Sequence, residues 1–495
     1  MNLHQLLLTS SIWPESALRD WHGIEITGIT SDSRNVKPGD LFIAISGFQQ
    51  DGHQYIEAAI KAGAAAVAGE KVLQEALPVP YIQLEDGRKQ MALLGIAFYG
   101  MPQKKHKMVG ITGTNGKTTT AFMIKHILET AGLSCSLFGS IANYINGKWY
   151  RASNTTPDSL QLQELLYRSD DEYVVMEVSS HGISQHRVEG VEFDYALFTN
   201  LDQDHLDYHH TMEEYFAVKS KLFQQLSLSG KAFINTDSIW GGKLAENLRS
   251  EGKELYTFGE NMGNDLRLSE WKTSKFPAAI LNETENRGHF IQLAVPGLHN
   301  IYNAGLAFLT LKKMGIEERV ISEALMKFPG VPGRNEVYKE DSQPTLMVDY
   351  AHTSEALYHC LKTAKECGAE KVYHVFGFRG GRDESKRGEM IKLSSDLSDG
   401  YVLTQDDLNG LPEHEILYEL EKLQTAFGNE KGRIISDRTM AIQYMFMHAS
   451  PGDWIVVTGK GAEPYQQAFE LPAASDGETI SYLQRTAAAQ AKKAE

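Results

Sequence analysis

The sequence predicts an α/β protein with mostly parallel sheets, and three observations lead to this fold class. Continuous apolar runs at 173–178 and 195–200 are typical of parallel strands that are covered on both faces. Strand and helix signals alternate along residues 108–331, as they do in doubly wound sheets. A second alternating segment follows the Pro- and Gly-rich stretch at 328–334, which is typical of a domain boundary.

Three domains are expected from the length of 495 residues and from that boundary. We predict a small N-terminal α/β domain at 1–107, a central domain with a P-loop ATPase-like doubly wound sheet at 108–331, and a C-terminal Rossmann-like α/β domain at 332–495. In the N-terminal domain we predict a strand at 41–45 and an amphipathic helix at 55–66. The strands predicted in the C-terminal domain lie at 345–349, 371–376 and 454–458.

The segment between the apolar strand at 108–111 and the helix at 121–128 has the composition of a phosphate-binding loop. Its glycines let backbone N–H groups approach a phosphate, and the N-terminus of the following helix adds positive potential. Lys117 is expected to reach the β- and γ-phosphates of a nucleoside triphosphate, and Thr118 to bind Mg²⁺. Ile111 stands where the general P-loop spacing has its first glycine, so an ordinary Gly-rich turn is the alternative. The predicted loop residues are Gly113, Thr114, Asn115, Gly116, Lys117, Thr118 and Thr119.

The overall composition excludes some classes of protein. The formal net charge of −16 and the pI of about 5.6 argue against a nucleic-acid-binding protein, whose binding surface is basic. Three cysteines without a metal-binding spacing fit a reducing compartment. The N-terminus lacks the features of a signal peptide, and no apolar run reaches the roughly 20 residues of a membrane span. We therefore expect a cytoplasmic protein whose partners include neither nucleic acid nor a membrane.

Several short motifs flank the phosphate-binding loop, and their order is more specific than any one of them. They are Ser31-Asp32-Ser33-Arg34, Asp51-Gly52-His53, Asn154-Thr155-Thr156-Pro157, Glu177-Val178-Ser179-Ser180-His181-Gly182, Gln185-His186-Arg187, Asn200-Leu201-Asp202-Gln203-Asp204-His205, Ala217-Val218-Lys219, Gly297-Leu298-His299-Asn300, Gly333-Arg334, Asp349-Tyr350-Ala351-His352 and Gly459-Lys460-Gly461. In this order and spacing the chain resembles the Mur ligases over essentially its whole length. Among these it resembles most the members that add the third residue of the peptidoglycan stem peptide.

The resemblance implies an ATP-dependent amide-forming ligase. In this family ATP phosphorylates a substrate carboxylate to an acyl phosphate, which the amine of an amino acid then attacks. Such a reaction depends on positioning and charge neutralisation more than on protein nucleophiles. The implied partners are UDP-N-acetylmuramoyl-L-alanyl-D-glutamate, whose uridine end the N-terminal domain would bind, ATP and a free amino acid. The implied metal cofactor is Mg²⁺.

The resemblance also assigns roles to individual residues. Catalytic roles fall to Lys117, Glu177, His205 and Lys219, and metal binding to Thr118, Glu177, His205 and Lys219. ATP is expected to contact the phosphate-binding loop together with Asn300, Asn303, Arg334 and Asp349. The UDP-substrate is expected to contact Ser31, Ser33, Phe48, Gln49, Gln50, Asn154, Thr155, Thr156, Ser179, Gln185 and Arg187. The amino acid is expected to contact Arg382, Asp406, Asp407, Asn409, Gly459 and Glu463.

Taken singly, several of these residues also fit structural roles. Glu177 alone fits a surface carboxylate at a strand end, and His205 alone fits a hydrogen-bonded structural histidine. Asn300 also fits a turn or cap residue, and Thr155-Thr156-Pro157 fits a helix N-cap followed by proline. It is the ensemble of motifs that favours the functional roles.

Lys219 lies in the helical run 213–223, where an ammonium cannot act as a ligand to Mg²⁺. Family members carry a carbamylated lysine at the matching position, so the resemblance implies a CO₂-derived carbamate on Lys219. Carbamylation replaces the cation with an anion that has two oxygen acceptors, which suits Mg²⁺. The alternative is a surface helix lysine, as is expected for Lys221.

The amino-acid pocket departs from that of the best-known family members. Those that add meso-diaminopimelate carry Asp-Asn-Pro-Arg where this chain has Asp406-Asp407-Leu408-Asn409. Asn409 cannot supply the bidentate cation that binds a distal carboxylate. Asp406, Asp407 and Glu463 suit an ammonium-ended side chain, so an L-lysine-like amino acid is expected ahead of meso-diaminopimelate. The alternative for the two aspartates is that they are solvated loop acids.

Two other functions fit parts of the pattern. A folylpolyglutamate-synthetase-like or other ATP-dependent amino-acid ligase would share the reaction, but the N-terminal segment with Asp32-Ser33-Arg34 argues against it. A nucleotide-binding paralogue without catalytic activity would share the fold of these ligases but not their reaction. Against that alternative is the presence of all four expected catalytic residues, Lys117, Glu177, His205 and Lys219.

Overall fold

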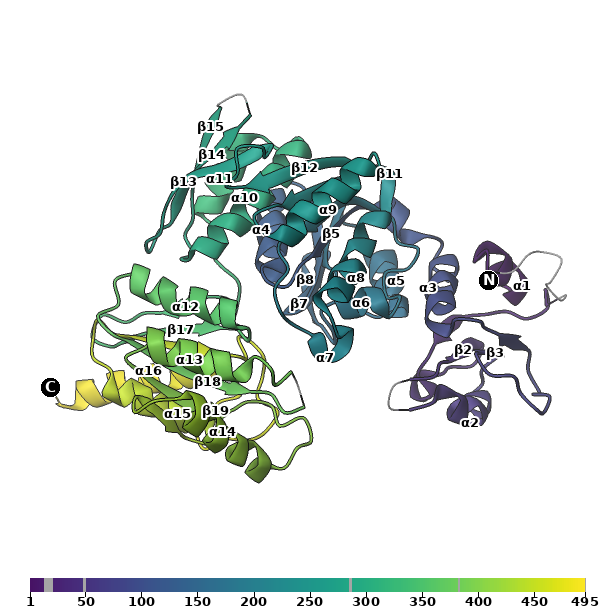
Figure 1. The fold of residues 1–495 in the computed structure, drawn as a ribbon. Helices are drawn as coiled ribbons and strands as arrows, with labels where there is room; N and C mark the ends of the chain where they lie inside the picture. The colour runs from purple at the N-terminus through teal and green to yellow at the C-terminus, as the bar shows by residue number, and fades with distance from the viewer. Residues whose placement is uncertain (13–20, 48–49, 285–286, 382, 495) are drawn as a thin grey trace. The chain divides into compact units, whose positions relative to one another are not determined.

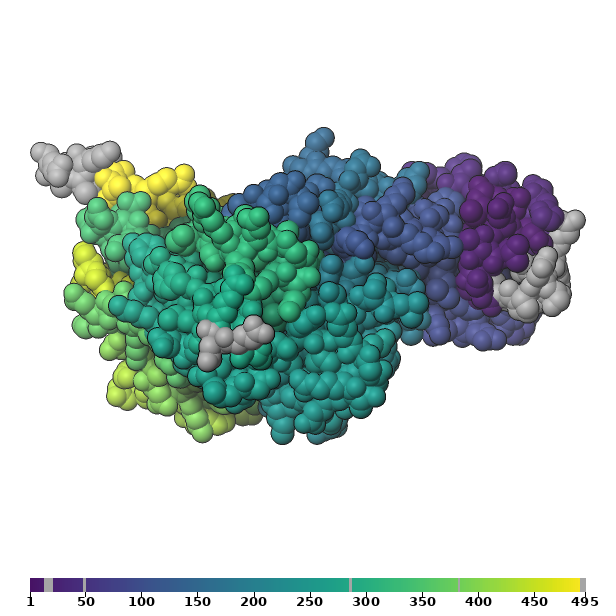
Figure 2. All heavy atoms as spheres, turned by 90° about the horizontal axis from the view of Figure 1, so that it is seen from above, coloured from purple at the N-terminus to yellow at the C-terminus, as the bar shows by residue number. Residues whose placement is uncertain are grey.

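The computed structural model describes residues 1–12, 21–47, 50–284, 287–381 and 383–494, and the side chains among these up to 489 (Figure 1). Figure 2 shows all heavy atoms of the chain in the same colours. Three sheets of four, eleven and six strands alternate with helices, which confirms the predicted α/β class. No helix in the described ranges is long and apolar enough to cross a membrane.

The contacts between Cα atoms divide the chain into two compact units. Unit 1 holds residues 1–112, 133–196 and 218–231, and unit 2 holds 113–132, 197–217 and 232–495.

The N-terminal sheet is parallel throughout, in the order β1-β2-β3-β4. Its two faces are packed differently: Leu41 and Ile43 of β2 point to a cluster with helices α1 and α3, whereas Phe42 packs with helix α2. This alternation along one strand is what a sheet covered on both faces requires. The elements are α1 (Leu3–Thr9), β1 (Gly28–Thr30), η2 (Ser33–Asn35), β2 (Asp40–Ala44), η3 (Gly52–Tyr55), α2 (Ile56–Lys61), β3 (Ala66–Gly69), β4 (Tyr81–Gln83), α3 (Gly87–Phe98) and η4 (Pro102–Lys105).

The helix predicted at 55–66 is too long. Helix α2 ends at Lys61, and Gly63 follows with a φ of 106°, a backbone conformation that stops a helix. Ala66 begins strand β3, whose four residues are all buried. Alanine occurs in both helices and strands, so the sequence pattern predicted a helix that continues as far as Ala66. In the structure, burial in the sheet makes Ala66 the first residue of a strand instead.

The central sheet has the order β15-β14-β13-β12-β11-β10-β5-β9-β6-β7-β8. Strand β9 pairs in parallel with β5 on one side and β6 on the other, so the carboxyl ends of these strands share one edge. The strands are β5 (Lys107–Thr112), β6 (Cys135–Phe138), β7 (Ala142–Ile145), β8 (Lys148–Arg151), β9 (Tyr173–Glu177), β10 (Phe193–Phe198), β11 (Leu226–Asn235), β12 (Glu254–Gly259), β13 (Leu266–Lys272), β14 (Ala278–Glu283) and β15 (Gly288–Gln292). The helices are α4 (Lys117–Thr130), α5 (Ser159–Arg168), α6 (Ser180–Ser184), α7 (Leu206–His209), α8 (Met212–Gln224), α9 (Ile239–Ser250), α10 (Leu298–Lys313) and α11 (Glu318–Met326).

The C-terminal sheet has the order β16-β17-β21-β18-β19-β20, with only β16 antiparallel to its neighbour (Figure 1). Helices α12, α13 and α14 cover one face of it, and α15 and α16 the other. The elements are β16 (Glu336–Tyr338), β17 (Thr345–Asp349), α12 (Ser354–Glu366), β18 (Val372–Phe378), α13 (Arg387–Leu397), β19 (Gly400–Gln405), α14 (Glu413–Phe427), β20 (Gly432–Ile434), α15 (Arg438–His448), β21 (Trp454–Thr458) and α16 (Asp476–Ala494).

A buried ion pair joins the first residues of helices α15 and α16. Arg438 Nε lies 2.7 Å from Asp476 Oδ1 and its Nη2 lies 2.8 Å from Oδ2, and both side chains are fully buried. Nη2 also donates to the carbonyl of Thr458 at the end of β21. Burial alone would lower the pKa of Arg438, but Asp476 raises it above its ordinary value.

We expect Asp476→Asn to destabilise the C-terminal sheet by about 3–5 kcal/mol, because the guanidinium of Arg438 would stay buried without its counter-charge. Amide hydrogen exchange along β17 and β21 measures this loss. The control is Asp396→Asn, since Asp396 is exposed in the same domain. Protection of β21 that is equal in the two variants would contradict the assignment of a stabilising pair.

Candidate active site

The phosphate-binding loop connects β5 to α4 in the way that its sequence predicts. Helix α4 begins at Lys117, and Gly113 and Gly116 have φ values of 148° and 83°. A Cβ atom on Gly113 would overlap the hydroxyl of Thr199, and one on Gly116 would overlap the amide of Asn303. The ammonium of Lys117 donates to the carbonyl oxygens of Gly113 at 2.9 Å and of Thr114 at 2.8 Å. These contacts hold the Lys117 side chain against the backbone of the loop that precedes helix α4.

Residues 199–202, which follow strand β10, hold the loop in place. Asn115 N donates to Asn200 Oδ1 at 2.8 Å, and Asn115 Nδ2 donates to Asp202 Oδ2 at 3.1 Å. The hydroxyl of Thr199 donates to the Asn115 carbonyl at 2.6 Å, and Asp202 N donates to Thr114 Oγ1 at 3.0 Å. The motif at 199–205 therefore preorganises the loop, a role that its sequence did not indicate.

Helix α10 places the two residues expected to bind adenine next to helix α4. Asn300 and Asn303 are buried, and Thr120 Oγ1 donates to Asn303 Oδ1 at 3.4 Å. Asn300 Nδ2 donates to the Pro296 carbonyl at 2.7 Å, which also fits the structural alternative for this residue. The assignment of both residues to adenine stays a prediction.

Arg334 and Asp349 lie in the same compact unit as the loop. Nη2 of Arg334 lies 3.5 Å from Thr118 Oγ1, and the guanidinium stacks on the Tyr350 ring with 4.1 Å from Cζ to the centroid. The carboxylate of Asp349 accepts hydrogen bonds from the backbone N–H groups of Asn335 at 2.7 Å and Ala351 at 2.6 Å. The two side chains are therefore held by contacts within the protein.

Asp204 is the centre of a charged cluster beside His205. Its carboxylate lies 3.4 Å from His205 Nε2, 3.3 Å from His352 Nε2 and 3.0 Å from Lys386 Nζ. Burial acts to raise the pKa of Asp204, but His352, His205 and Lys386 together lower it well below its ordinary value. His205 itself has a φ of 56°, an uncommon conformation for a residue other than glycine.

Glu177 lies at the carboxyl end of β9 and is buried, so it is not the surface carboxylate of the structural alternative. Its Oε1 accepts from the backbone N–H of Ser140 at 2.7 Å, and its Oε2 lies 3.2 Å from the Ser140 hydroxyl. A Cβ on Gly139 would overlap this carboxylate. Ser140, which the sequence motifs did not single out, thus orients Glu177.

The expected contacts to the UDP-substrate form one hydrogen-bonded group. Thr156 Oγ1 donates to the Glu177 carbonyl at 2.9 Å and lies 3.1 Å from Ser179 Oγ. Arg187 donates to the carbonyl of Thr156 and to Gln185 Oε1, both at 2.8 Å. Thr155 joins the group through the hydroxyl of Ser140, at 3.1 Å.

The helix N-cap alternative for Thr155-Thr156-Pro157 is wrong. Helix α5 begins at Ser159, and its N-cap is Asp158, whose side chain accepts from Gln161 N.

The remaining residues expected to bind the UDP-substrate lie apart from that group or outside the described ranges. Asn154 is exposed and donates to Ser153 Oγ at 3.4 Å. Ser31 is exposed, Ser33 begins η2, and exposed Gln50 accepts from the Tyr55 hydroxyl at 3.3 Å. Phe48, Gln49 and the amino-acid candidate Arg382 lie outside the described residues.

Lys219 is 1% exposed, whereas Lys221 on the same helix is exposed. The surface-lysine alternative is therefore wrong for Lys219 and right for Lys221. A long cationic side chain is seldom fully buried unless it is paired or modified.

The expected Mg²⁺ ligands are distributed over both units: Thr118 and His205 are in unit 2, and Glu177 and Lys219 are in unit 1. Hydroxyl and carboxylate oxygens, in particular the fixed carboxylate of Glu177, are donors that suit this hard cation. Of the expected ligands, Thr118 and Glu177 therefore fit Mg²⁺ by their chemistry, whereas an unmodified Lys219 does not.

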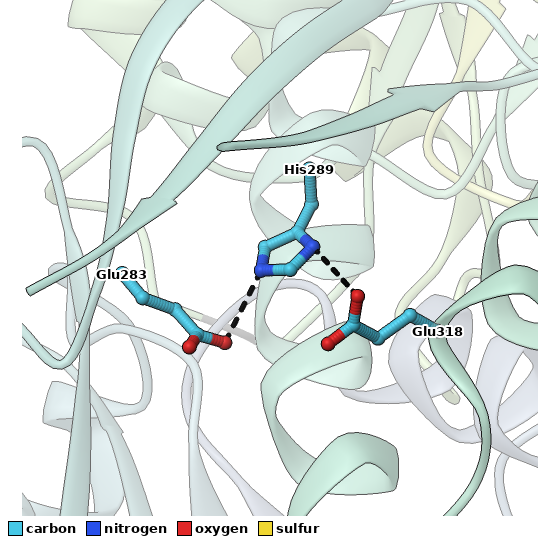
Figure 3. Close-up of side chains that lie close together, drawn as sticks. All are labelled: Glu283, His289 and Glu318. Atoms are coloured by element: carbon cyan, nitrogen blue, oxygen red, sulfur yellow. Dashed lines mark hydrogen bonds and ion pairs between the residues drawn. The ribbon is translucent and has the colours of Figure 1, made fainter. Parts of the chain in front are cut away.

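A second group with metal-ligand spacing, formed by Glu283, His289 and Glu318, lies on β14, β15 and α11 (Figure 3). His289 lies between Glu283 at 3.2 Å and Glu318 at 3.0 Å. Lys312 contacts Glu283 and lies 2.6 Å from Glu318, and Arg287 lies 2.9 Å from Glu318. Burial acts to raise the pKa of both carboxyls, but Lys312 and its neighbours lower it. The ammonium of Lys312 thus already supplies the cation, and we interpret the group as a structural ion-pair cluster.

Asp406 and Asp407, at the end of β19, are buried rather than solvated. Lys460 Nζ lies 2.5 Å from Asp407 Oδ1 and 3.6 Å from Asp406 Oδ1. Arg379 Nε lies 3.6 Å from Asp406 Oδ1 and 4.0 Å from Asp407 Oδ2. Both aspartates therefore already have cationic partners, so they do not offer the free negative charge that the expected binding of an ammonium group requires.

Arg379 also contacts Glu463, and its Nη2 lies 3.4 Å from the carbonyl of Gly459. Asn409 Nδ2 donates to the carbonyl of Gly380 at 2.9 Å. This hydrogen bond joins the loop that follows β19 to the loop that follows β18. Sequence reasoning missed Arg379. Its position directly after β18, at the edge where ligands of such sheets bind, was the available signal.

Protein-family models match the three parts of the chain in order. The Mur ligase family catalytic domain matches residues 25–99, the Mur ligase middle domain 111–311, and the Mur ligase glutamate ligase domain 333–461. Two curated relatives are named UDP-N-acetylmuramoyl-L-alanyl-D-glutamate–2,6-diaminopimelate ligase. The one from Clostridium botulinum is 40% identical over 89% of this chain and 91% of its own, and the one from Alkaliphilus metalliredigens is 37% identical over 90% of each. The chain belongs to the Mur ligase family.

As a Mur ligase it is an ATP-dependent enzyme that forms amide bonds, which excludes the non-catalytic alternative. Solved structures agree with the fold. A 2,6-diaminopimelate ligase covers 98% of this chain and 99% of its own at 27% identity and a TM-score of 0.69. MurF from Acinetobacter baumannii is 19% identical, covers 92% of this chain and 94% of its own, and has a TM-score of 0.67. Folylpolyglutamate synthase from Mycobacterium tuberculosis shares the fold alone. It is 16% identical, covers 74% of this chain and 91% of its own, and has a TM-score of 0.60.

The expectation of an L-lysine-like amino acid is wrong, because these curated relatives are named 2,6-diaminopimelate ligases. The folylpolyglutamate-synthetase-like alternative is corrected by the same relatives. The physical reason for the error is charge. The sequence shows acids at Asp406, Asp407 and Glu463, and only the structure shows that Lys460 and Arg379 already pair with them.

Proposed function

We propose that this Mur ligase joins 2,6-diaminopimelate to UDP-N-acetylmuramoyl-L-alanyl-D-glutamate in peptidoglycan synthesis. The observation that carries the proposal is the likeness to relatives of that activity along nine-tenths of the chain. The partly exposed Arg379 in the predicted amino-acid pocket supports it, since this substrate has a second carboxylate that L-lysine lacks.

Each group of residues then has a role that its chemistry suits. The loop and Lys117 bind the phosphates of ATP and neutralise charge during phosphoryl transfer. The hydroxyl and amide group around Thr156 holds the UDP-substrate, and Arg187 suits a carboxylate. Mg²⁺ would neutralise the phosphate oxygens, and the hydroxyl of Thr118 next to the loop would be one of its ligands.

The carbamate on Lys219 is part of the proposal. The resemblance to family members that carry a carbamylated lysine at the matching position supports it, and the side chain of Lys219 is buried. A carbamate would provide an oxygen ligand of the kind that Mg²⁺ prefers.

We expect 2,6-diaminopimelate to be the better amino-acid substrate. With ATP and UDP-N-acetylmuramoyl-L-alanyl-D-glutamate at saturation, kcat/KM for the meso isomer should exceed that for L-lysine by about tenfold or more, because the partly exposed guanidinium of Arg379 can bind the extra carboxylate. ADP release measures turnover, and mass spectrometry identifies the UDP-tripeptide. A reaction without the UDP-substrate serves as the control. Faster use of L-lysine would contradict the proposed function.

A further inference from the structure

We propose that Arg379 is a specificity-determining residue that binds the distal carboxylate of 2,6-diaminopimelate. The inference rests on the proposed function and goes beyond it by naming the side chain that selects the amino acid. The motifs in the sequence do not include this position.

The distal end of the substrate is a zwitterion. Diaminopimelate has an amino group and a carboxylate at each end, so the end that does not react carries one positive and one negative charge. L-Lysine carries only an ammonium at the matching end. A site that separates the two amino acids therefore needs an accessible cation as well as an accessible anion.

The predicted pocket has two cations, and they differ in accessibility. Lys460 is 1% exposed and is held 2.5 Å from Asp407. Arg379 keeps 23% of its side chain exposed, and its partner Glu463 keeps 40%. Arg379 and Glu463 are thus a partly exposed ion pair, and Arg379 Nε also lies 3.6 Å from the buried Asp406 Oδ1. The carboxylate of the zwitterion can pair with the guanidinium of Arg379, and its ammonium can pair with the carboxylate of Glu463.

Arg379 is also held in a fixed orientation. Its Nη1 donates to the Tyr350 hydroxyl at 3.4 Å, and its Cζ lies 5.3 Å from the centroid of the Tyr350 ring. Its backbone carbonyl accepts from Arg387 Nη2 at 3.0 Å. A preorganised guanidinium loses little conformational entropy when it binds a planar carboxylate through two N–H groups.

Asn409 does not compete for this role. Its side-chain amide donates to the carbonyl of Gly380, directly after Arg379, and its own φ is 50°. Gly380 N donates to the Asp407 carbonyl at 3.0 Å. These bonds fix the loop that carries Arg379 against the loop that carries Asp407. Asn409 therefore positions the guanidinium and offers no charge of its own.

The test is the ratio of kcat/KM for meso-2,6-diaminopimelate to kcat/KM for L-lysine. In Arg379→Gln this ratio should fall by roughly 100-fold, because a charge-assisted bidentate contact is lost only for diaminopimelate. Arg379→Lys keeps the charge without the planar fork, and its ratio should fall by about tenfold. KM for ATP should stay within about twofold in both variants. The control is Arg485→Gln, which removes an exposed arginine on α16.

The outcomes separate this inference from the proposed function. A wild-type enzyme that prefers L-lysine would overturn the proposed function, and this inference with it. A wild-type enzyme that prefers diaminopimelate, with a ratio within threefold of wild type in Arg379→Gln, would overturn the inference alone. If Arg379→Gln does not fold, Arg379→Lys decides, and an unchanged ratio in that variant overturns the inference.

Discussion

Lys117→Ala is expected to lower kcat by at least about 1,000-fold, since the ammonium is the cation of the loop that we expect to reach the β- and γ-phosphates. In the structure this ammonium is held by the carbonyls of Gly113 and Thr114. Binding of a nucleotide would exchange these carbonyls for phosphate oxygens, which are stronger partners because they are charged. ADP formation at saturating ATP measures the effect.

The control for this variant is Lys104→Ala, because Lys104 is an exposed lysine on η4, before the loop. Circular dichroism and thermal unfolding of both variants separate a loss of charge from a loss of fold. Activity of Lys117→Ala within tenfold of wild type, or about 1.4 kcal/mol of barrier, would contradict the assignment of the phosphate-binding loop.

Lys219→Ala is expected to be almost inactive, and short carboxylic acids such as acetate or formate should restore part of its activity. The physical reason is that a small carboxylate can occupy the space left by the side chain and supply oxygen atoms in place of the proposed carbamate. The measurement is ADP formation by the variant as a function of added acetate, with ionic strength held constant by chloride.

Lys221→Ala is the matched control, since Lys221 lies two positions away on α8 and is exposed. It should keep wild-type activity and show no response to acetate. Near-normal activity of Lys219→Ala without added carboxylate would refute the carbamate proposal. Loss of activity in Lys219→Ala with no rescue, together with an unshifted lysine mass in the wild-type peptide under conditions that preserve carbamates, would refute it as well.

The amino-acid pocket shows where sequence reasoning reaches its limit. The pattern Asp406-Asp407-Leu408-Asn409 indicates negative charge, and on its own it favoured an ammonium-ended substrate. The partner that neutralises Asp407, Lys460, is 53 positions away in the chain. A sequence window shows how many charges there are, but the free charge of a pocket depends on which of them pair across strands β18, β19 and β21.

The sequence by itself determined the elements whose signal is local. The succession of strand, Gly-rich turn and helix around the predicted phosphate-binding loop follows from its glycines and the flanking apolar runs, and the strands predicted at 345–349 and 454–458 have those bounds in the structure. Backbone geometry and hydrophobic periodicity act over a few residues, so a short window contains them. The order of the motifs was enough to indicate the Mur ligase family.

Only the tertiary structure decided which side chains are buried and which charges meet. It placed Lys219 in the interior and Lys221 at the surface, although both lie on one helix. Helix α2 ends before Ala66 because the residues from Ala66 to Gly69 form a buried strand of the N-terminal sheet. The tertiary structure also brought Arg379 to Glu463 across 84 positions of the chain. Burial and charge pairing depend on distances in space that the fold sets, and residues far apart in the sequence decide them.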